Sequence, residues 1–297
     1  MVHHNECPLC GSVNTKEKLI CKDHLVSGEI FKIISCNSCC FVFTQDYPEE
    51  KDIGKYYESE DYISHSDTSK GFTNKLYQVA RKIMLKRKKK LVRKITGVSG
   101  GRLLDIGSGT GYFASVMKNS GWDVKGIEIN DHAREFSKSH FNMDAIRPVD
   151  IAELKNNTFN CITLWHVLEH FHDPFSYINE IKRLLKPEGK CIIALPNCGS
   201  YDAASYGAHW AGYDVPRHLW HFTPESFRFL CNKTGLKLIS EKPLPLDVFY
   251  ISQLSEKHMA SSAPFIKGML KATLFALHAW FIKKKTSSLI YIVEKQK

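Results

Sequence analysis

The sequence lacks a long hydrophobic run. Its most apolar stretch, "ATLFALHAWFI", covers residues 272–282, and these eleven residues fall far short of the ~20 that a helix needs to cross a bilayer. The first residues, "MVHHNECPLC", also lack the basic start and apolar core of a secretory signal peptide. We therefore expect a cytoplasmic protein that has no membrane-spanning helix.

Acidic residues are missing from one long stretch. Between Lys70 and Lys94 there are eleven Lys or Arg and no Asp or Glu, while the whole chain carries a net charge of +10. The positive excess is thus local and is not the broad basic surface typical of nucleic-acid binding. Apolar residues here recur at roughly helical spacing. We expect a helix that covers an edge of the next domain; the alternative is contact with an anionic membrane or a phosphorylated substrate.

Cysteine is plentiful but unevenly placed. Six of the ten cysteines fall in the first forty residues, where they include the pairs CPLC (Cys7, Cys10) and CNSC (Cys36, Cys39). Two such pairs separated by a hairpin form a four-thiolate site suited to tetrahedral zinc. Four thiolates leave no open coordination position, so the zinc would be structural. The alternative, two buried or disulfide-bonded pairs, fits a reducing compartment poorly.

The chain divides into three regions by pattern. Residues 1–45 form the zinc-ribbon-like module, and residues 46–96 form a polar linker and the basic amphipathic helix. Residues 97–297 alternate strand-like and helix-like segments, which predicts an α/β fold: a doubly wound, mostly parallel seven-stranded sheet. Residues 243–285 read as a helical insertion before the last strand. We expect this insertion to be buried in the domain, with membrane-surface contact as the alternative.

A glycine-rich turn, "LLDIGSGTGYF", ends one strand and opens a helix. Its spacing is GxGxG, and Tyr112 stands where the dinucleotide fingerprint GxGxxG requires a small residue. Asp105, two residues before the first glycine, suits a ligand with a cationic amino group. Glu128 ends the next strand in "GIEIN" and can accept two hydrogen bonds from a ribose diol. Together these features favour S-adenosylmethionine (SAM), an adenosine joined to an amino acid.

At this point the chain resembles the class I SAM-dependent methyltransferases, with a Rossmann-like fold. The stretches "NCITLWHVLEHFHDP" and "IKRLLKPEGKCIIALPN" resemble the small-molecule branch that contains ubiquinone-biosynthesis-type O-methyltransferases and sugar methyltransferases. The resemblance covers about residues 97–242 and the last strand. Some sugar C-methyltransferases of this broad group also carry an N-terminal four-cysteine module, a likeness that depends on cysteine spacing alone.

The resemblance implies roles for individual residues. Asp105 and Gly107 would hold the methionine amino group, Glu128 the ribose, and Ile129 the adenine. The remaining implied SAM contacts are Ser108, Gly109 and Gly111 in the turn, Asp150 and Ile151 at the adenine amine, and Trp165 and His166 at the methionine and methyl end. Asp150 could instead cap a helix. Trp165 and His166 could be structural, and for Glu169 and His170 a structural role is the main expectation.

The segment "HWAGYDVPRHLWHF", residues 209–222, follows the fifth strand of the predicted sheet. Ligands of doubly wound sheets bind beyond the carboxyl ends of the strands, so this segment should face the transferable methyl group. We predict His218 or His221 as the general base and Arg217 as the anchor of an anionic substrate group. Five further residues could wall the pocket: His209, Trp210, Tyr213, Asp214 and Trp220. Tyr57, Tyr62 and His65 are candidates for a lid, with packing in the linker as the alternative.

The predicted function is methyl transfer from SAM to the oxygen or carbon of a small-molecule acceptor, such as a sugar nucleotide, a lipid-linked glycan or a quinol. One alternative is an RNA methyltransferase that uses the zinc module and the basic helix. The residues after the fourth strand, Leu164-Trp165-His166, lack the Asp/Asn-Pro-Pro-aromatic motif of many such enzymes, so a nucleic-acid partner is not expected. The other alternative is a non-catalytic SAM-binding or zinc-scaffolded interaction protein.

Overall fold

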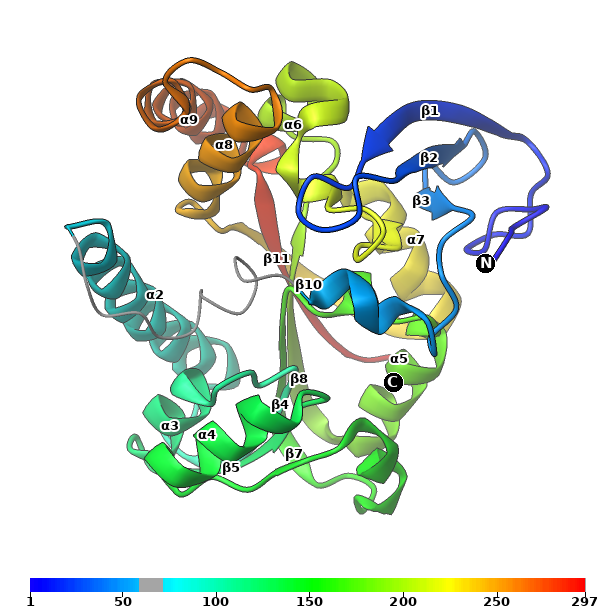
Figure 1. Cartoon of the computed structure of the whole chain (residues 1–297). Coiled ribbons are helices and arrows are strands. Elements are labelled where there is room, and N and C mark those ends of the chain that lie inside the picture. Colours follow the sequence, from blue (N-terminus) through cyan, green and yellow to red (C-terminus); the bar gives the residue numbers. More distant parts are fainter. Residues whose placement is uncertain (59–71, 297) are drawn as a thin grey trace.

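The computed structural model describes residues 1–58 and 72–296 (Figure 1). At its centre lies a seven-stranded sheet with the strand order β10-β11-β8-β7-β4-β5-β6. The five strands β8, β7, β4, β5 and β6 are parallel, and β11 runs antiparallel to both of its neighbours. The strands are β4 (Gly101–Ile106), β5 (Trp122–Ile127), β6 (Ala145–Ile146), β7 (Phe159–Trp165), β8 (Leu185–Pro196), β10 (Leu236–Pro243) and β11 (Ser288–Lys295). The predicted mostly parallel, doubly wound sheet is confirmed.

Helices cover both faces of this sheet, so its central strands are apolar on both sides. On one face Ile162 and Ile193 pack with α5 (Pro174–Leu184) and α7 (Pro224–Thr234). On the other face Cys161 and Ile192 pack with α3 (Tyr112–Lys118) and the long α2 (Phe72–Thr96). The remaining helices are α4 (Asp131–Phe141), α6 (Tyr201–Tyr206), α8 (Asp247–His258) and α9 (Pro264–Phe281), and the short 3-10 turns are η1 (Ile53–Tyr57), η2 (Pro148–Glu153), η3 (Leu168–His170), η4 (Gly207–His209), η5 (Ala211–Tyr213) and η6 (Lys283–Lys285).

Capping residues in the sequence mark the first and last turns of α7. Thr223 caps its first turn by accepting a hydrogen bond from Ser226 N, and Pro224 occupies the first helical position, where no N–H is needed. Gly235 ends the helix with a φ of +68°, a left-handed conformation that glycine adopts without strain. These signals fix the point at which the chain leaves the 209–222 segment and returns to the sheet.

The N-terminal residues form a second, smaller sheet. It contains β1 (Thr15–Lys22), β2 (Ile30–Cys36) and β3 (Val42–Gln45), and its fourth strand is β9 (Trp220–His221). The sequence predicted the β1–β2 hairpin but not the strand contributed from residue 220. Phe41, Phe43 and Tyr47 pack with Phe222 and Phe227 in one buried cluster with the main sheet. The N-terminal sheet is therefore continuous with the core of the larger domain.

The insertion between β10 and β11 folds as the pair α8 and α9, which lie side by side (Figure 1). Gly268 of α9 faces the Gln253 backbone so closely that an added Cβ would lie 2.8 Å from the Gln253 Cα. The expected burial of this insertion is wrong for the outer face of α9. Leu270 is 64% exposed and Phe281 is 85% exposed, because only one side of α9 meets α8. Within residues 1–58 and 72–296, no helix is long and apolar enough to cross a membrane.

Candidate active site and four-cysteine site

The glycine-rich turn joins β4 to α3 in a conformation that needs its glycines. Gly107, Gly109 and Gly111 have φ values of +70°, +52° and +82°, all in the left-handed region. A Cβ on Gly107 would overlap Val167, and one on Gly111 would overlap Ser137. Gly109 differs, because a Cβ there would meet nothing within 4 Å. The turn thus packs tightly on two sides and presents its middle glycine to open space, as a loop that approaches a ligand must.

Asp105 lies at the carboxyl end of β4 and is 2% exposed. Burial raises the pKa of its carboxyl to about 7, while the Thr163 hydroxyl, which donates to it at 2.6 Å, and the nearby Lys88 ammonium oppose that rise. A buried carboxyl of this kind becomes a stable anion when a cationic amino group binds beside it. Ser108 Oγ and Trp165 Nε1 are buried near it with no hydrogen-bond partner among the described residues. These features fit the methionine end of SAM.

Glu128 follows β5, as predicted, and its carboxylate turns back to the glycine loop. It accepts hydrogen bonds from Gly109 N at 2.7 Å and from Asn130 N at 2.9 Å. The neighbouring Ile129 is 75% exposed, so an apolar side chain stands beside the carboxylate at the surface. The Glu128 carboxylate could accept hydrogen bonds from a diol, and the Ile129 side chain could pack against a flat aromatic ring.

Asp150 and Ile151 lie in η2, after the short strand β6. The Asp150 carboxylate accepts from Arg147 N at 3.3 Å, so the structure places it in a capping arrangement, the alternative considered from sequence. Ile151 is 8% exposed and packs into the core below the loop. The adenine contact remains a prediction for both residues.

Trp165 and His166 come directly after the buried part of β7. The Trp165 ring packs edge-on against Phe113, and the Lys88 ammonium lies 4.2 Å from its ring centre. Burial lowers the pKa of Lys88 to about 8, although Asp105 and Asp247 act against this shift. Nothing in the sequence distinguishes Lys88 from the other ten basic residues between Lys70 and Lys94.

His166 has a φ of +59°, an uncommon conformation for a residue with a side chain. Its Nε2 lies 2.9 Å from Asp247 Oδ2, and its Nδ1 lies 3.5 Å from Glu169 Oε1. Burial alone would lower its pKa, but hydrogen bonds to Asp247 and Glu169 dominate and raise the pKa to about 10. His166 is therefore an imidazolium at neutral pH. Asp247 opens α8 in the insertion, and sequence reasoning missed it.

Glu169, His170 and His218 form a second polar cluster, whose ligand-type atoms lie within 4.8 Å of one another. The Glu169 carboxylate is fully buried, and the three nearby histidines hold its pKa low even though burial opposes this. His170 and His218 meet edge-to-face at 4.6 Å, and burial lowers the pKa of His170 to about 4. One carboxylate and two imidazoles in contact can share a proton or hold a cation. The structure thus brings Glu169 and His170 into contact with the predicted base, and the structural role expected for them stays a prediction.

His218 is the predicted base whose ring lies in this cluster. Its Nδ1 lies 2.9 Å from the carbonyl oxygen of Gly212, which can only accept, so Nδ1 carries the proton. The lone pair is then on Nε2, which lies 3.9 Å from Asp214 Oδ2. His218 can therefore accept a proton at Nε2.

His221 and Arg217 do not occupy the positions expected of them. His221 is 3% exposed, pairs through its backbone with Val42, and has Nε2 at 2.9 Å from the Thr44 hydroxyl. Arg217 is 1% exposed and bonds to Asp214, Asp23 and the Tyr56 carbonyl. Both side chains are used in contacts with the N-terminal region. The substrate roles predicted for them therefore do not fit the structure.

The other aromatics of the 209–222 segment are packed. Trp210, Tyr213 and Trp220 are each at most 3% exposed, and the Trp210 indole N–H donates to Asp202 at 2.7 Å. His209 is exposed and contacts the ring of His24. Of the candidate lid residues, Tyr57 places its hydroxyl 3.1 Å from His170 Nδ1, at the edge of the cluster. Tyr62 and His65 lie outside the described residues.

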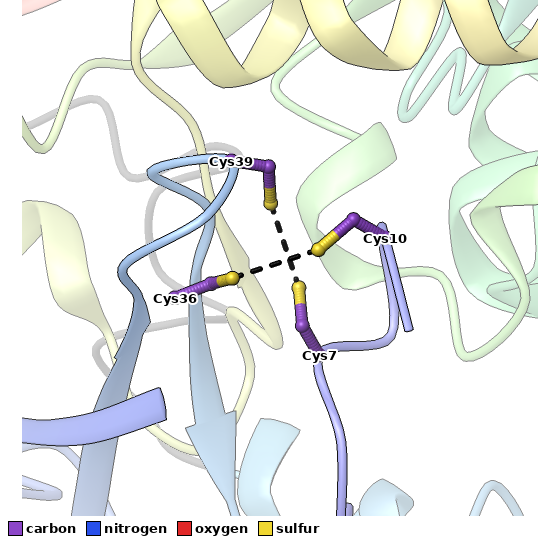
Figure 2. Close-up of side chains that lie close together, drawn as sticks. All are labelled: Cys7, Cys10, Cys36 and Cys39. Carbon is purple, nitrogen blue, oxygen red and sulfur yellow. Dashed lines mark hydrogen bonds between the residues drawn. The ribbon is translucent and has the colours of Figure 1, made fainter. Parts of the chain in front are cut away.

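The four predicted metal ligands converge at one point. The sulfurs of Cys7, Cys10, Cys36 and Cys39 point toward one another (Figure 2). The Sγ atoms of Cys7 and Cys39 lie 3.6 Å apart, as do those of Cys10 and Cys36. A disulfide would need about 2.05 Å, whereas a tetrahedral metal with bonds of about 2.3 Å separates its sulfurs by about 3.8 Å. The arrangement fits a four-thiolate metal site.

Comparison with known proteins agrees with this geometry. Residues 77–241 match the family model described as a methyltransferase domain. A ubiquinone biosynthesis O-methyltransferase of Haemophilus ducreyi is 30% identical over 181 residues, which cover 55% of this chain and 75% of that protein. The protein of the same name from Alkalilimnicola ehrlichii is 33% identical over 135 residues, which cover 42% of this chain and 55% of that protein.

The fold of a solved structure is also similar. A protein from Galdieria sulphuraria described as a sarcosine dimethylglycine methyltransferase aligns with 71% of this chain and 86% of its own, at a TM-score of 0.50 and 16% identity. Its likeness concerns the fold alone. The family match covers more than half of the chain and includes the glycine loop, Asp105 and Glu128. This chain therefore belongs to the methyltransferase-domain family and is a class I SAM-dependent methyltransferase.

Proposed function

We propose that the enzyme methylates an oxygen or an acidic carbon of a small-molecule acceptor, with His218 as the general base. The observation that carries this proposal is the cluster in which Glu169 and His170, from the turn η3 after β7, meet His218 of the 209–222 segment. Bound SAM would supply a methyl group made electrophilic by its sulfonium. The acceptor must lose a proton as the methyl bond forms, and a base in contact with it accelerates such a step about 10²–10⁴-fold.

The chain's own residues divide the work of holding the two ligands. In this proposal Asp105 binds the methionine amino group, Glu128 exchanges its loop hydrogen bonds for the ribose diol, and Ile129 covers the adenine. Asp150 and Ile151 complete the adenine side. Trp165 and His166 border the methyl group, where the cationic His166 can hold the methionine carboxylate.

His218 suits the base role because its tautomer is set by the Gly212 carbonyl. His218 lies in one cluster with the ionised Glu169, whose negative charge stabilises the imidazolium that forms when His218 takes a proton. Asp214 adds a second carboxylate at 3.9 Å. The named relatives are ubiquinone biosynthesis O-methyltransferases. We therefore favour a hydroxyl group of a quinol-type or lipid-linked acceptor, with a sugar nucleotide as the second class.

We also propose that residues 1–45 are a structural zinc module attached to the methyltransferase domain at 97–297 by the 46–96 linker. Thiolates select zinc over the hard cations, and four of them leave no position for a substrate. The S···S separations of 3.6 Å in this site support that metal and that role.

A third part of the proposal concerns α9, whose outer face we assign to the surface of an anionic membrane, on its cytoplasmic side. The exposed residues Ile266, Leu270, Leu274, Leu277 and Phe281 recur every three or four positions along one side of the helix, and Trp280 beside them is 81% exposed. Residues 264–285 contain no Asp or Glu. Lys267 and Lys283–Lys285 are exposed at the two ends of the helix. An apolar stripe with basic ends is complementary to anionic lipid headgroups over an acyl boundary.

Replacement of the base tests the catalytic proposal. His218→Gln should lower kcat at least about 100-fold, because proton removal loses its acceptor, while SAM affinity measured by calorimetry stays within about twofold. His140→Gln, on the exposed side of α4, is the matched control and should retain full activity. Full turnover by His218→Gln in a methyl-transfer assay with a quinol acceptor would remove His218 from the reaction.

The raised pKa of His166 predicts a pH dependence of stability. A histidine whose folded pKa lies near 10 stabilises the fold fully below its unfolded value of about 6.5, and this contribution is lost as the pH rises toward 10. The difference in unfolding free energy between the wild type and His166→Gln, from urea titrations, should therefore be largest near pH 6.5 and shrink by pH 10. A difference that stays constant over this range would contradict the Asp247 and Glu169 pairing.

Metal analysis tests the four-cysteine site. The purified protein should contain one zinc per chain, and Cys36→Ser should lose it because one thiolate ligand is gone. Cys40→Ser is the matched control, since Cys40 is exposed and does not belong to the cluster. Equal zinc content in all three proteins would show that the four thiolates do not bind the metal.

Vesicle binding tests the face of α9. The protein should float with phosphatidylglycerol vesicles and detach as salt rises, and the double variant Trp280→Gln/Phe281→Gln should bind at least about tenfold more weakly. Val13→Gln changes an equally exposed apolar residue of the N-terminal region and should bind as the wild type. Dimerisation in light scattering without vesicle binding would assign this face to a second copy of the chain instead.

A further inference from the structure

We propose that the N-terminal module positions the acceptor-side histidine, with Thr44 and Asp23 as the positioning residues. This inference depends on the proposed role of His218 and extends it to residues that touch neither SAM nor the acceptor. Three sets of contacts between the N-terminal module and the 209–222 segment carry it.

The first is the strand pairing. β9 pairs antiparallel with β3, with Phe43 opposite Trp220 and Val42 opposite His221. One residue further along, Thr44 N donates to the Leu219 carbonyl at 2.9 Å. The chain immediately after His218 therefore belongs to the sheet of the N-terminal module. On its other side, this stretch bonds to the larger domain through a bridge between Phe222 and Asn197 and a hydrogen bond from Leu219 N to the Glu169 carbonyl at 2.9 Å.

The second contact acts on His218 itself. The Thr44 hydroxyl is fully buried and donates to the His218 carbonyl at 2.8 Å. A hydroxyl has one hydrogen, so its bond to His221 Nε2 at 2.9 Å must run the other way, from an N–H of His221 to the threonine oxygen. Burial holds the pKa of His221 well below its ordinary range, which keeps that ring neutral. His221, Thr44 and the backbone of His218 thus form one directed hydrogen-bond chain.

The third contact fixes the residue before His218. Arg217 Nη2 lies 3.0 Å from Asp23 Oδ1 in the β1–β2 turn, and these two side chains are 1% and 0% exposed. Asp23 also accepts from Leu25 N and Ser27 N, so it is fully bonded within its own turn. Arg217 in turn holds Asp214, the carboxylate nearest to His218 Nε2. A shift of the module would therefore move both the base and its neighbouring anion.

A purely stabilising interface would make the same contacts, so the test must observe the histidine directly. We would record nitrogen-edited NMR spectra of ¹⁵N-histidine-labelled full-length protein and assign His218 by its loss in His218→Gln. The wild type should show His218 as the Nδ1–H tautomer. Thr44→Val keeps the shape of the side chain and removes the hydroxyl, so the two ring-nitrogen signals of His218 should converge toward an averaged position. Thr44→Ser retains the hydroxyl and should restore them.

Ser35→Ala is the matched control, because it removes a hydroxyl from the neighbouring strand β2 that bonds only to the Lys16 carbonyl. It should leave His218 unchanged. Asp23→Asn provides an independent variant should Thr44→Val fail to fold, and it should shift the same signals. In both Thr44→Val and Asp23→Asn, SAM affinity by calorimetry should stay within twofold of the wild type, and the signals of His132 and His140 should not move.

Two results would overturn the proposal. One is an unchanged His218 spectrum in both Thr44→Val and Asp23→Asn. The other is a general loss, in which SAM affinity falls and all histidine signals broaden, because that would mark the interface as merely stabilising. These readouts do not depend on turnover. A failure of His218 as the base would appear in the kinetics of His218→Gln and leave this NMR result intact.

Discussion

The arrangement of the N-terminal module against the methyltransferase domain depends on the hydrogen bonds and ion pairs of one buried side chain, Arg217. Its guanidinium is removed from water and bonded to Asp23, to Asp214 and to the Tyr56 carbonyl. A buried charge that loses one partner destabilises a protein by about 3–5 kcal/mol, so the three contacts constrain one another. They join the first hairpin, the 3-10 turn η1 in the linker and the loop after β8. The 209–222 segment is irregular in backbone, yet Arg217 ties it to two other parts of the chain.

The charges of the site follow from the same low-dielectric setting. Glu169 is buried and ionised, and it is balanced by His166, which two carboxylates keep protonated. His170 stays neutral, since burial lowers its pKa to about 4. Burial raises the pKa of Asp105 to about 7, so its carboxyl is only partly ionised at neutral pH. A cationic ligand beside it would stabilise the ionised form. Charge is thus paired within the protein around Glu169, whereas in our proposal the SAM amino group completes the pairing at Asp105.

The sheet and the SAM loop could be predicted from the sequence because their signals are local. Apolar runs such as "CIIALP" and the glycines at 107, 109 and 111 specify strands and a left-handed turn regardless of what packs around them. The cysteine pairs are equally local. Arg217 and His221 were assigned wrongly because their partners, Asp23 and Thr44, lie more than 170 residues away in the chain. Residue type indicated a polar function but not which polar groups would meet.

Lys88 and Asp247 are two residues near the candidate site that the sequence does not identify. Both reach the site from outside the central αβ pattern: Lys88 from the basic helix α2, and Asp247 from the first turn of α8. Neither stands out by spacing, since α2 is basic throughout and the insertion reads as an amphipathic helix pair. Three additions to the sheet therefore reach this group of residues. The N-terminal module reaches His218 through Thr44 and Arg217, α2 reaches Trp165, and the insertion reaches His166. In our proposal the sheet carries the glycine loop for SAM, whereas these additions supply the surroundings of the acceptor. Differences in acceptor within such a fold are thus expected to arise in them.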